Sequence, residues 1–537
     1  MLLDLDEEDA RKTVWIIEAP GKIHQMTAIL KDLGHEATMI ATCGHFCTMP
    51  DSLKDVGIDK KLNEFKRDPN PEIVKKLREG VQGVEEVFIA TDADQEGDVI
   101  AVDVATVIKD ICPAPVRVRL KSLDKDSVQD AIDRATPVQI SDAIPGRTRA
   151  IVDRLIGAGF AAQGVGAGRI KSAILGIVAS KKVTPFRLYL TAPSEDDMTW
   201  SCMTDILPPL TLAVADQLNK LAFPILMEQR QEVQTPLPDD MGRIMVKAGD
   251  EMDMSPTAAA EAMQAAYQSG RLSYPRSDVR GLSEAAANKV GRSLRKTGQR
   301  FDRAVVAIKS DDDVHDSPYP IGDVDVNHNP EALGASEGIR VLIARNLVQC
   351  GQKNKVYFHV KGPLKAYLMK NGFSEEVASL IDGLPWTKTL ANRMAGQGAK
   401  KGLFKRRIDT VLLEKCVEAG LGRPSTYAKH IQNFMDSGLI DASANLTEEG
   451  RSILAKTPKI MLGTKLSQAI EKACTTKIEA SNEDTPWVDL ATRIVNALPP
   501  ELKAAIAPVL QPEQEQQREH TTPAQEAGRS TGPEMSY

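Results

Sequence analysis

The chain has 537 residues, a formal net charge of −7 and only 4% aromatic residues, and this length predicts several domains with buried cores. The acidic balance excludes a uniformly cationic surface, so a nucleic-acid partner would have to bind in a local basic groove. The seven cysteines form no CxxC pair and no run of about 18 apolar residues exists, which argues against a zinc ribbon and a membrane span and favours a cytoplasmic protein with reduced thiols.

The first apolar segment, residues 13–17, predicts a buried strand that ends at Glu18. A helix is predicted over 23–33, so the chain opens with the strand, turn and helix of an α/β unit. A carboxylate at the carboxyl end of such a strand points into the crevice where these folds bind ligands. The alternative for Glu18 is a solvated loop acid.

A second apolar run, residues 87–90, leads into three alternate acids, Asp92, Asp94 and Glu96. This spacing is expected to gather the carboxylates at one strand end, where they repel one another unless solvent or a cation separates them. Carboxylates are hard oxygen ligands, so Mg²⁺ is the expected ion; the alternative is an acidic turn with an N-capping Asp. Helices are predicted over 72–80 and 99–109 and an exposed or edge strand over 116–120. Together these elements predict a doubly wound α/β module with both acidic strand ends as neighbours.

Two basic segments follow this module. Residues 146–157 predict a helix with Arg147 and Arg154 on one face, and a glycine-rich turn then opens a helix with Arg169 and Lys171 in its first turn. Cations at a helix N-terminus oppose its dipole, so a phosphate would balance them; a solvated basic face is the alternative. The glycine segment lacks the Walker A spacing, so no ATP site is expected.

The next candidate for a chemical role is a tyrosine, Tyr274. A helix predicted over 258–268 leads to Tyr274, which Pro275 holds in an extended conformation. Arg276, two residues on, is expected on the same strand face, where it could bind a phosphoryl oxygen. A lone tyrosine at a strand end is ordinarily a packing residue, but beside a carboxylate metal site Tyr274 is a candidate oxygen nucleophile.

The C-terminal third contains one further anion-site pattern. Residues 421–447 predict a helix and a short wing, with Ser425 capping the helix and Arg423 nearby as a phosphate seat. Five cations around one Phe at 400–407 fit a DNA-facing loop or a solvated one. Residues 511–537 are rich in Gln, Glu, Pro, Ser and Thr and predict a disordered tail.

These patterns together resemble the type IA DNA topoisomerases. The matching segments are Ile17 to Lys22, Gly44-His45 with Met49-Pro50 and Thr91 to Gly97, which are similar to a Toprim domain, and then residues 146–157, 166–172, 271–278 and 421–428. The Tyr-Pro-Arg-Ser-Asp run at Tyr274 is the most specific match. Within this family the sequence most resembles a bacterial topoisomerase III, in a minimal form without C-terminal zinc ribbons. Gln95 departs from the family pattern, where an arginine is usual, and Ala19 stands where a serine is common.

The resemblance implies an ATP-independent isomerase. Tyr274 would attack a phosphodiester of single-stranded DNA, giving a 5′-phosphotyrosine that is religated after strand passage, so that negative supercoils are relaxed or DNA is decatenated. The implied catalytic residues are Tyr274, Glu18, Arg276, Lys22 and His315, and the implied Mg²⁺ ligands are Asp92, Asp94, Glu96 and Glu18. The implied DNA-binding residues are Arg149, Asp153, Arg154, Arg169, Lys171, Asp278, Arg423, Ser425 and Thr426. Glu18 would protonate the leaving 3′-oxygen, while Lys22 and Arg276 would stabilise charge on the phosphoryl group.

The implied fold is an α/β plus α+β multidomain chain, with a Toprim doubly wound α/β domain followed by a ring-shaped core. The expected boundaries are an N-terminal extension at 1–12, the Toprim domain at 13–140, a single-strand-binding lobe at 141–188 and 408–510 whose second part is winged-helix-like, an arch or gate at 189–252 and 351–407, a tyrosine domain at 253–350 and the tail at 511–537. The expected protein is a cytoplasmic, nucleoid-associated monomer that binds single-stranded DNA without ATP or a membrane, with a helicase or single-strand-binding protein as a candidate partner. The alternatives are another Toprim enzyme, a primase or nuclease, and a catalytically inactive ring that binds single strands.

Overall fold

The computed structural model describes residues 12–510 except 167, 196–197, 235, 311–314, 352–354, 362–363, 391–401, 477 and 479–481. The predicted tail at 511–537, nearly all of the N-terminal extension and the first two residues of the basic segment 400–407 lie outside the described residues. None of the described helices combines the length and the apolar character that crossing a membrane requires.

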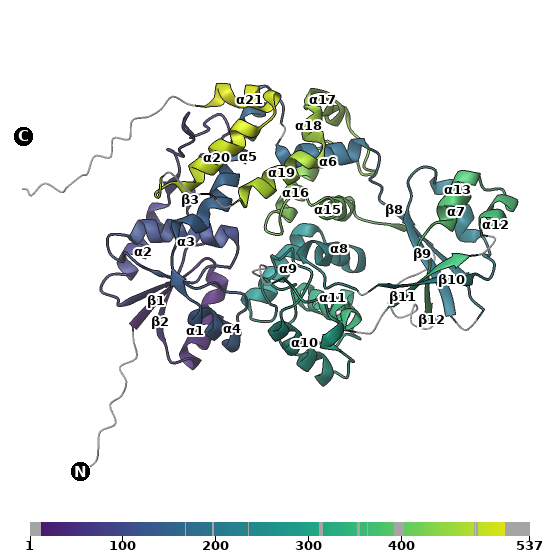
Figure 1. Ribbon diagram of the computed structural model, residues 1–537, viewed down its shortest axis with the longest axis horizontal. Coiled ribbons are helices and arrows are strands. Elements are labelled where there is room, and N and C mark those ends of the chain that lie inside the picture. The colour runs from purple at the N-terminus through teal and green to yellow at the C-terminus, as the bar shows by residue number, and fades with distance from the viewer. Residues whose placement is uncertain are drawn as a thin grey trace, which may run out of the picture.

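A five-stranded sheet with helices on both faces forms the N-terminal domain, at the left of Figure 1. Its strands are β1 (Lys12–Ile17), β2 (Glu36–Ala41), β5 (Glu86–Ile89), β6 (Val116–Arg117) and β7 (Thr136–Pro137), in the order β2-β1-β5-β6-β7, and its helices are α1 (Ile23–Asp32), α2 (Pro71–Gly80), α3 (Gln95–Ile108) and α4 (Lys125–Asp133); β3 (Cys47–Thr48) and β4 (Asp68–Pro69) form a separate ribbon. Because strand side chains alternate, Val14 and Ile16 pack with α2 and α3, whereas Trp15 and Ile17 pack with α1 and α4. The predicted doubly wound α/β domain is confirmed.

Strand β6 differs from the prediction of an exposed or edge strand over 116–120. It is two residues long and lies between β5 and β7, and the Arg117 side chain is 1% exposed. The Arg117 guanidinium donates to the main-chain oxygens of Thr91 (2.9 Å) and Asp92 (2.7 Å). The alternation was misleading because this buried cation bonds carbonyl groups at the strand end instead of water.

Two apolar cores organise the helices in the centre of the molecule. The first contains α6 (Arg169–Ala179), α8 (Met241–Met252), α9 (Pro256–Gln268), α10 (Glu284–Lys296), α11 (Ala335–Cys350), α15 (Ile408–Glu418) and α16 (Tyr427–Asp436). The second contains α5 (Ile144–Ala162), α18 (Lys459–Leu462), α19 (Thr464–Cys474), α20 (Pro486–Ala497) and α21 (Pro500–Ile506). Helix α17 (Glu448–Lys456) packs against both through Ile453. Short 3-10 turns complete the chain: η1 (Pro20–Lys22), η2 (Ile140–Ala143), η3 (Arg303–Val305), η4 (Pro330–Ala332) and η5 (Ala507–Val509).

These cores differ from the predicted domain boundaries at two places. Helix α8 was counted with the arch at 189–252, but its buried side chains pack with the tyrosine domain. The predicted second part of the lobe, 408–510, is divided: α15 and α16 belong to the first core, and α18 to α21 belong to the second. Apolar spacing marks the buried face of each helix but not which core that face joins, so the cores cross boundaries that stay predictions.

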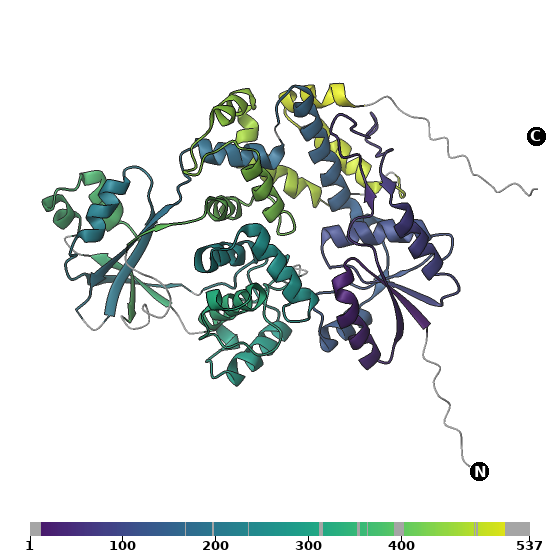
Figure 2. The same cartoon turned by 180° about the vertical axis from the view of Figure 1, so that it is seen from behind.

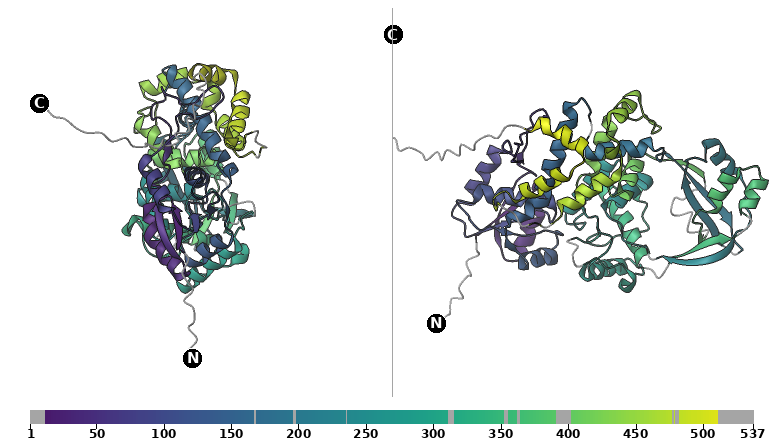
Figure 3. Two further views of the ribbon diagram at one scale, coloured as in Figure 1. Left: turned by 90° about the vertical axis from the view of Figure 1, so that its left-hand side faces the viewer. Right: turned by 45° about the horizontal axis from the view of Figure 1, so that its top comes forward.

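The elements within residues 186–234 and 355–405, which we call the arch after the prediction, project at the opposite end from the N-terminal domain (Figures 1 and 3). Its elements are β8 (Phe186–Pro193), β9 (Met198–Asp205), α7 (Leu212–Lys220), β10 (Met227–Gln234), β11 (Lys355–Lys361), α12 (Leu364–Lys370), α13 (Glu375–Asp382), β12 (Thr387–Leu390) and β13 (Gly402–Lys405). The four-stranded sheet β12-β9-β8-β13 packs on α7, α12 and α13, and β10 pairs with β11. The chain enters and leaves the arch twice, from α6 to β8 and from β10 to α8, then from α11 to β11 and from β13 to α15, as the reverse view in Figure 2 also shows.

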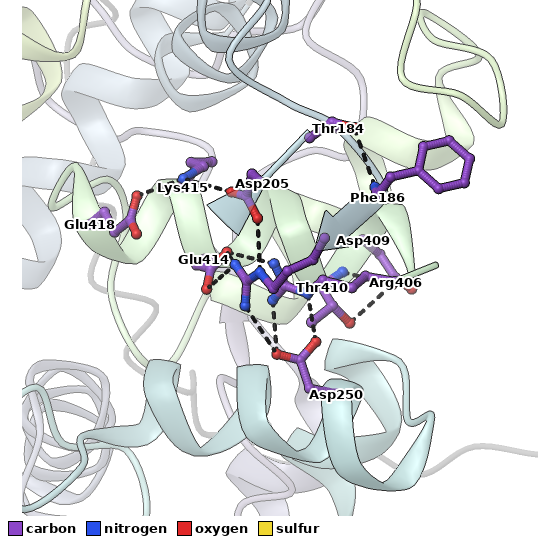
Figure 4. A network of polar contacts seen from close by, with 11 residues as sticks. Thr184, Phe186, Asp205, Asp250, Arg406, Asp409, Thr410, Glu414, Lys415 and Glu418 are labelled. Atoms are coloured by element: carbon purple, nitrogen blue, oxygen red, sulfur yellow. Dashed lines mark hydrogen bonds and ion pairs between the residues drawn. The ribbon is translucent and has the colours of Figure 1, made fainter. Parts of the chain in front are cut away.

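A network of ion pairs holds the base of the arch (Figure 4). Arg406, directly after β13, donates to both carboxylate oxygens of Asp250 on α8 (2.7 and 2.9 Å) and to Glu414 on α15 (2.8 Å). Arg187 on β8 reaches Glu414 (3.1 Å) and Asp205 (2.8 Å). Arg406 is 6% exposed, so this member of the predicted basic segment 400–407 joins the arch to the helices and is neither solvated nor free to contact DNA.

Candidate active site

The two acidic strand ends lie side by side, as predicted. Strands β1 and β5 are parallel neighbours, so Glu18 and Asp92 leave the same edge of the sheet. The Asp92 amide donates to Glu18 Oε2 at 3.4 Å, and both side chains are buried. Glu18 is therefore not the solvated loop acid that was the alternative.

A buried lysine neutralises this pair of carboxylates. Lys22 ends the η1 turn and is fully buried; its ammonium donates a short hydrogen bond to Asp92 Oδ1 and lies 3.8 Å from Glu18 Oε1. Burial alone would raise the pKa of Asp92, but the Lys22 charge outweighs it and holds that pKa at about 2. The predicted repulsion is thus relieved by a cation that belongs to the chain. Lys22 contacts Asp92, whereas the resemblance implied that it would contact a phosphoryl oxygen.

Glu18 shows the opposite behaviour. Burial, and then the Asp92 charge, raise the pKa of Glu18 from 4.5 to about 8. Between these values the folded chain keeps a proton that the unfolded chain releases, so this contribution to stability is full below pH 4.5 and is lost as pH rises through about 8. Glu18→Gln cannot ionise and should flatten this fall, which thermal unfolding in EDTA at about pH 5 to 8 would measure. An unchanged pH dependence in the variant would contradict the assignment.

Of the four predicted metal ligands, Glu96 faces away from the other three. Asp94 caps α3 by accepting from the Gly97 amide (2.7 Å), which starts the helix four residues earlier than predicted. Glu96 lies within the first turn, with Oε2 2.6 Å from His45 Nε2. The first turn of α3 packs closely against the Asp92 main chain. Gly97 permits this packing because a Cβ there would lie 2.0 Å from the Asp92 carbonyl oxygen. Asp92 leaves the strand end, Asp94 precedes α3 as its N-cap, and Glu96 lies inside the helix and faces His45.

A cation nevertheless fits this crevice. Among the described residues no group of three His, Cys, Asp or Glu side chains is arranged to hold a metal ion. Asp92 Oδ2, however, is buried and has no hydrogen-bond partner within the part of the chain that the structure describes. An orphaned carboxylate oxygen beside the Glu18 and Asp94 carboxyl groups provides the hard oxygen donors that a divalent cation requires.

Tyr274 reaches this crevice from the tyrosine domain. Its amide donates to the Lys121 carbonyl (2.9 Å) and its phenol donates to Asp94 Oδ2 (2.5 Å), so both ends bind the N-terminal domain. The segment around it is extended but forms only an isolated bridge, not the predicted strand. Arg276 lies on the same side, with Nη1 3.9 Å from Asp94 Oδ2. Burial and the Asp94 charge raise the pKa of Tyr274, so the phenol stays protonated until a base accepts its proton.

His315 packs against this tyrosine. The two ring centroids are 4.6 Å apart, and neither imidazole nitrogen makes a hydrogen bond of ordinary geometry with the described residues. Burial lowers the pKa of His315, so the ring is neutral at pH 7. His315, which the resemblance implied as a catalytic residue, therefore lies directly against Tyr274.

Sequence reasoning missed a second tyrosine. Tyr267 on α9 is fully buried, donates to Asp92 Oδ1 (2.9 Å) and packs edge to face against Tyr274 at 5.4 Å. The Lys22 ammonium lies 5.0 Å from the centre of its ring. The only signal in the sequence was that Tyr267 is the sole aromatic residue of an alanine-rich helix.

Two predicted DNA-binding arginines are used within the protein. Arg154 donates to the main-chain oxygens of Pro50 (2.7 Å), Asp55 (2.7 Å) and Val56 (2.7 Å). Arg169 is 3% exposed and donates to both carboxylate oxygens of Asp153 (2.7 and 2.9 Å). The predicted anion at the start of α6 is therefore replaced by acidic side chains of the chain itself.

Most of the other predicted DNA-binding residues line one cavity or lie at the surface. Arg149, Asp153, Arg423 and Thr426 line a cavity of about 310 Å³ together with Arg147, Arg169, His45, Glu96 and Glu471, which we call the arginine cavity. Asp278 is exposed, and Lys171 is half-buried without an ion pair to the described residues. Ser425 does not cap α16: the helix begins at Tyr427, and Thr426 occupies the cap position.

Comparison with known proteins finds relatives of the N-terminal domain and of the longer chain. The Toprim domain family matches residues 13–123. DNA topoisomerase 1 of Treponema pallidum is 22% identical over 500 residues, covering 80% of this chain and 66% of that relative. DNA topoisomerase I, plasmid, of Xylella fastidiosa is 21% identical over 511 residues, covering 82% and 76%. Full-length topoisomerase I from Thermotoga maritima superposes with a TM-score of 0.59 at 16% identity, covering 93% of this chain and 90% of that one.

This is the fold of topoisomerase I from Thermotoga maritima. The resemblance predicted from the motifs is confirmed, and residues 13–123 form its Toprim domain. Tyr274, from another part of the chain, meets the acidic crevice of this Toprim domain. These relatives carry the name topoisomerase I, so the closer likeness to topoisomerase III stays a prediction. The chain spans just under two thirds of the length of the Treponema relative.

Proposed function

We propose that this chain is an ATP-independent type IA DNA topoisomerase that cleaves one strand of DNA through Tyr274, passes a strand and religates. The observation that carries the proposal is the 2.5 Å hydrogen bond from the Tyr274 phenol to Asp94, which brings a buried hydroxyl to the acidic edge of the Toprim sheet. The relatives named as topoisomerases favour this function over a primase, a nuclease or an inactive ring.

Cleavage would be a transesterification. The Tyr274 oxygen forms a bond to phosphorus while the bond from phosphorus to the 3′-oxygen breaks, and Asp94 is placed to accept the phenolic proton. Glu18, whose pKa of about 8 keeps it protonated at pH 7, would donate a proton to the leaving 3′-oxygen. Arg276 would stabilise charge on the phosphoryl oxygens. Religation reverses each transfer, and the phosphotyrosine conserves the bond energy, so no ATP is consumed.

Toprim domains bind divalent metal ions, and we propose Mg²⁺ here. Asp92 and Asp94 would hold it beside Glu18, and a bound cation supplies positive charge beside the phosphodiester. Lys22 would keep Asp92 ionised for this purpose. Glu96, which faces His45 and Arg149, belongs to the arginine cavity and not to this set.

We propose single-stranded DNA as the substrate, bound by a cytoplasmic monomer. Intact duplex would have to unpair to reach a buried phenol, and negative supercoiling supplies that opening whereas positive supercoiling opposes it. Relaxation of negatively supercoiled plasmid is therefore expected with Mg²⁺ and without ATP, with steep inhibition by added salt. Positively supercoiled plasmid should be relaxed only when it contains a single-stranded bubble. Equal rates on both fully duplex plasmids, compared side by side on a gel, would instead indicate a duplex-cutting enzyme.

A further inference from the structure

Glu471 on α19 lines the arginine cavity. Its Oε1 accepts from Arg169 (2.7 Å), and its Oε2 accepts from Arg423 Nε (2.8 Å) and lies 3.3 Å from Arg149 Nε. The three arginines come from α5, α6 and the segment before α16. One carboxylate thus joins the three basic segments that the sequence selected independently.

The charge of this carboxylate is strongly stabilised. Burial would raise its pKa, but Arg149, Arg169 and Arg423 hold the pKa of Glu471 at about 2. Glu471 therefore remains ionised at every pH at which the protein would work.

Arg169 and Arg423 differ in how many guanidinium nitrogens remain free to bind a ligand. Arg169 has other partners in Asp153 and the Ser467 carbonyl (3.1 Å) and is almost fully enclosed. Arg423 is 24% exposed and is held to the described residues through Nε, leaving both terminal nitrogens without a hydrogen bond among them. A guanidinium fixed by Nε presents its opposite edge, which matches two phosphate oxygens.

We infer that Glu471 is a positioning residue that fixes Arg423 in the arginine cavity so that the outer edge of its guanidinium binds a backbone phosphate of single-stranded DNA. This inference rests on the proposed function, because the DNA strand is its ligand. A carboxylate would then favour the binding of a polyanion, although its negative charge alone would oppose that binding.

The sign of one substitution separates positioning from charge. Removing an acid from a DNA-binding cavity should tighten binding if only net charge matters. Glu471→Gln, however, replaces one acceptor oxygen with an NH₂ donor that faces an arginine donor. Arg169 keeps its other partners, whereas Arg423 has none among the described residues. We therefore expect weaker binding by about tenfold, the size of a lost charge-assisted hydrogen bond.

Binding of a fluorescent oligothymidylate to the full chain in EDTA, followed by anisotropy, tests this inference. Glu471→Gln and Arg423→Ala should each raise Kd by about tenfold and reduce the slope of log K against log salt by about 0.7. Adding Glu471→Gln to Arg423→Ala should cost little more, because both remove one contact. Glu376→Gln removes the same charge from an exposed site on the arch helix α13 and should leave Kd unchanged.

Binding by Glu471→Gln that is as tight as wild type, or a full additional loss in the double variant, would overturn the inference. If Glu471→Gln does not fold, Arg423→Lys decides. Lysine keeps the positive charge but has no planar guanidinium that can bind Glu471 with one edge and a phosphate with the other. An unchanged Kd in this variant would overturn the positioning role of Glu471. A wild-type chain that does not bind the oligonucleotide would refute the proposed function itself, whereas wild-type binding with an unaffected Glu471→Gln would refute the inference alone.

Discussion

Tyr274→Phe should abolish DNA cleavage, with a loss of at least about 10⁴-fold in relaxation rate, because it removes only the attacking oxygen. The ring still packs against Tyr267 and His315, so the fold and the binding of single strands should persist. The lost hydrogen bond to Asp94 should lower stability by only about 1 to 2 kcal/mol. Plasmid relaxation, oligonucleotide cleavage and oligonucleotide binding should be measured on the same preparation.

Tyr267→Phe is the matched control for this experiment. It removes the same atom 5.4 Å away, from a phenol that donates to Asp92 and not to Asp94. The account predicts cleavage at a reduced rate in this variant, because Asp92 loses one of the contacts that orient it. If Tyr274→Phe still cleaved DNA, or if only Tyr267→Phe lost cleavage completely, Tyr267 and not Tyr274 would be the nucleophile.

Lys22→Met should lower the free energy of unfolding of the Toprim domain by about 3 kcal/mol, since breaking a buried ion pair leaves an uncompensated charge. The Asp92 carboxylate has no solvent exposure and would keep only the Tyr267 phenol as its partner on Oδ1. The double variant Lys22→Met with Asp92→Asn should recover a large part of the loss, because no charge then remains unpaired. Urea unfolding of the metal-free chain, followed by near-UV circular dichroism, measures both effects.

Stability that is unchanged in Lys22→Met would show that the ammonium does not neutralise Asp92. The same experiment separates two views of the crevice. Repulsion among three gathered carboxylates, as the spacing predicted, would make loss of a carboxylate stabilising. The observed contact between Lys22 and Asp92 predicts that Asp92→Asn alone is destabilising, because Lys22 is then buried without its main partner.

The elements that could be predicted are those that local patterns determine. The apolar runs before Glu18 and Asp92 gave parallel strands whose ends meet, and the serine cap, N1 proline and closing glycine of α9 all stand where helix rules expect them. Tyr274 was found because a short motif identified it. The predicted strand around it was wrong, since its amide pairs with Lys121 in another domain.

The remaining features depend on partners far apart in the sequence. Lys22 meets Asp92 over 70 residues and Arg169 meets Glu471 over 302, and no periodicity encodes such pairs. For this reason Arg169 was read as a phosphate ligand, although acids of the chain satisfy it. Ser425 shows the limit of local rules as well: its residue type favours a cap, but the helix starts one residue too late to use it.

The central claim is that Tyr274 becomes covalently joined to DNA. Wild-type chain should be mixed with a single-stranded oligonucleotide and Mg²⁺, denatured rapidly and digested with trypsin, and the peptides analysed by mass spectrometry. The account predicts one adduct, a 5′-phosphorylated fragment on the Tyr274 phenol, together with a released fragment that ends in a free 3′-hydroxyl. Cleaved DNA without a protein adduct, or an adduct on any other residue, would contradict it.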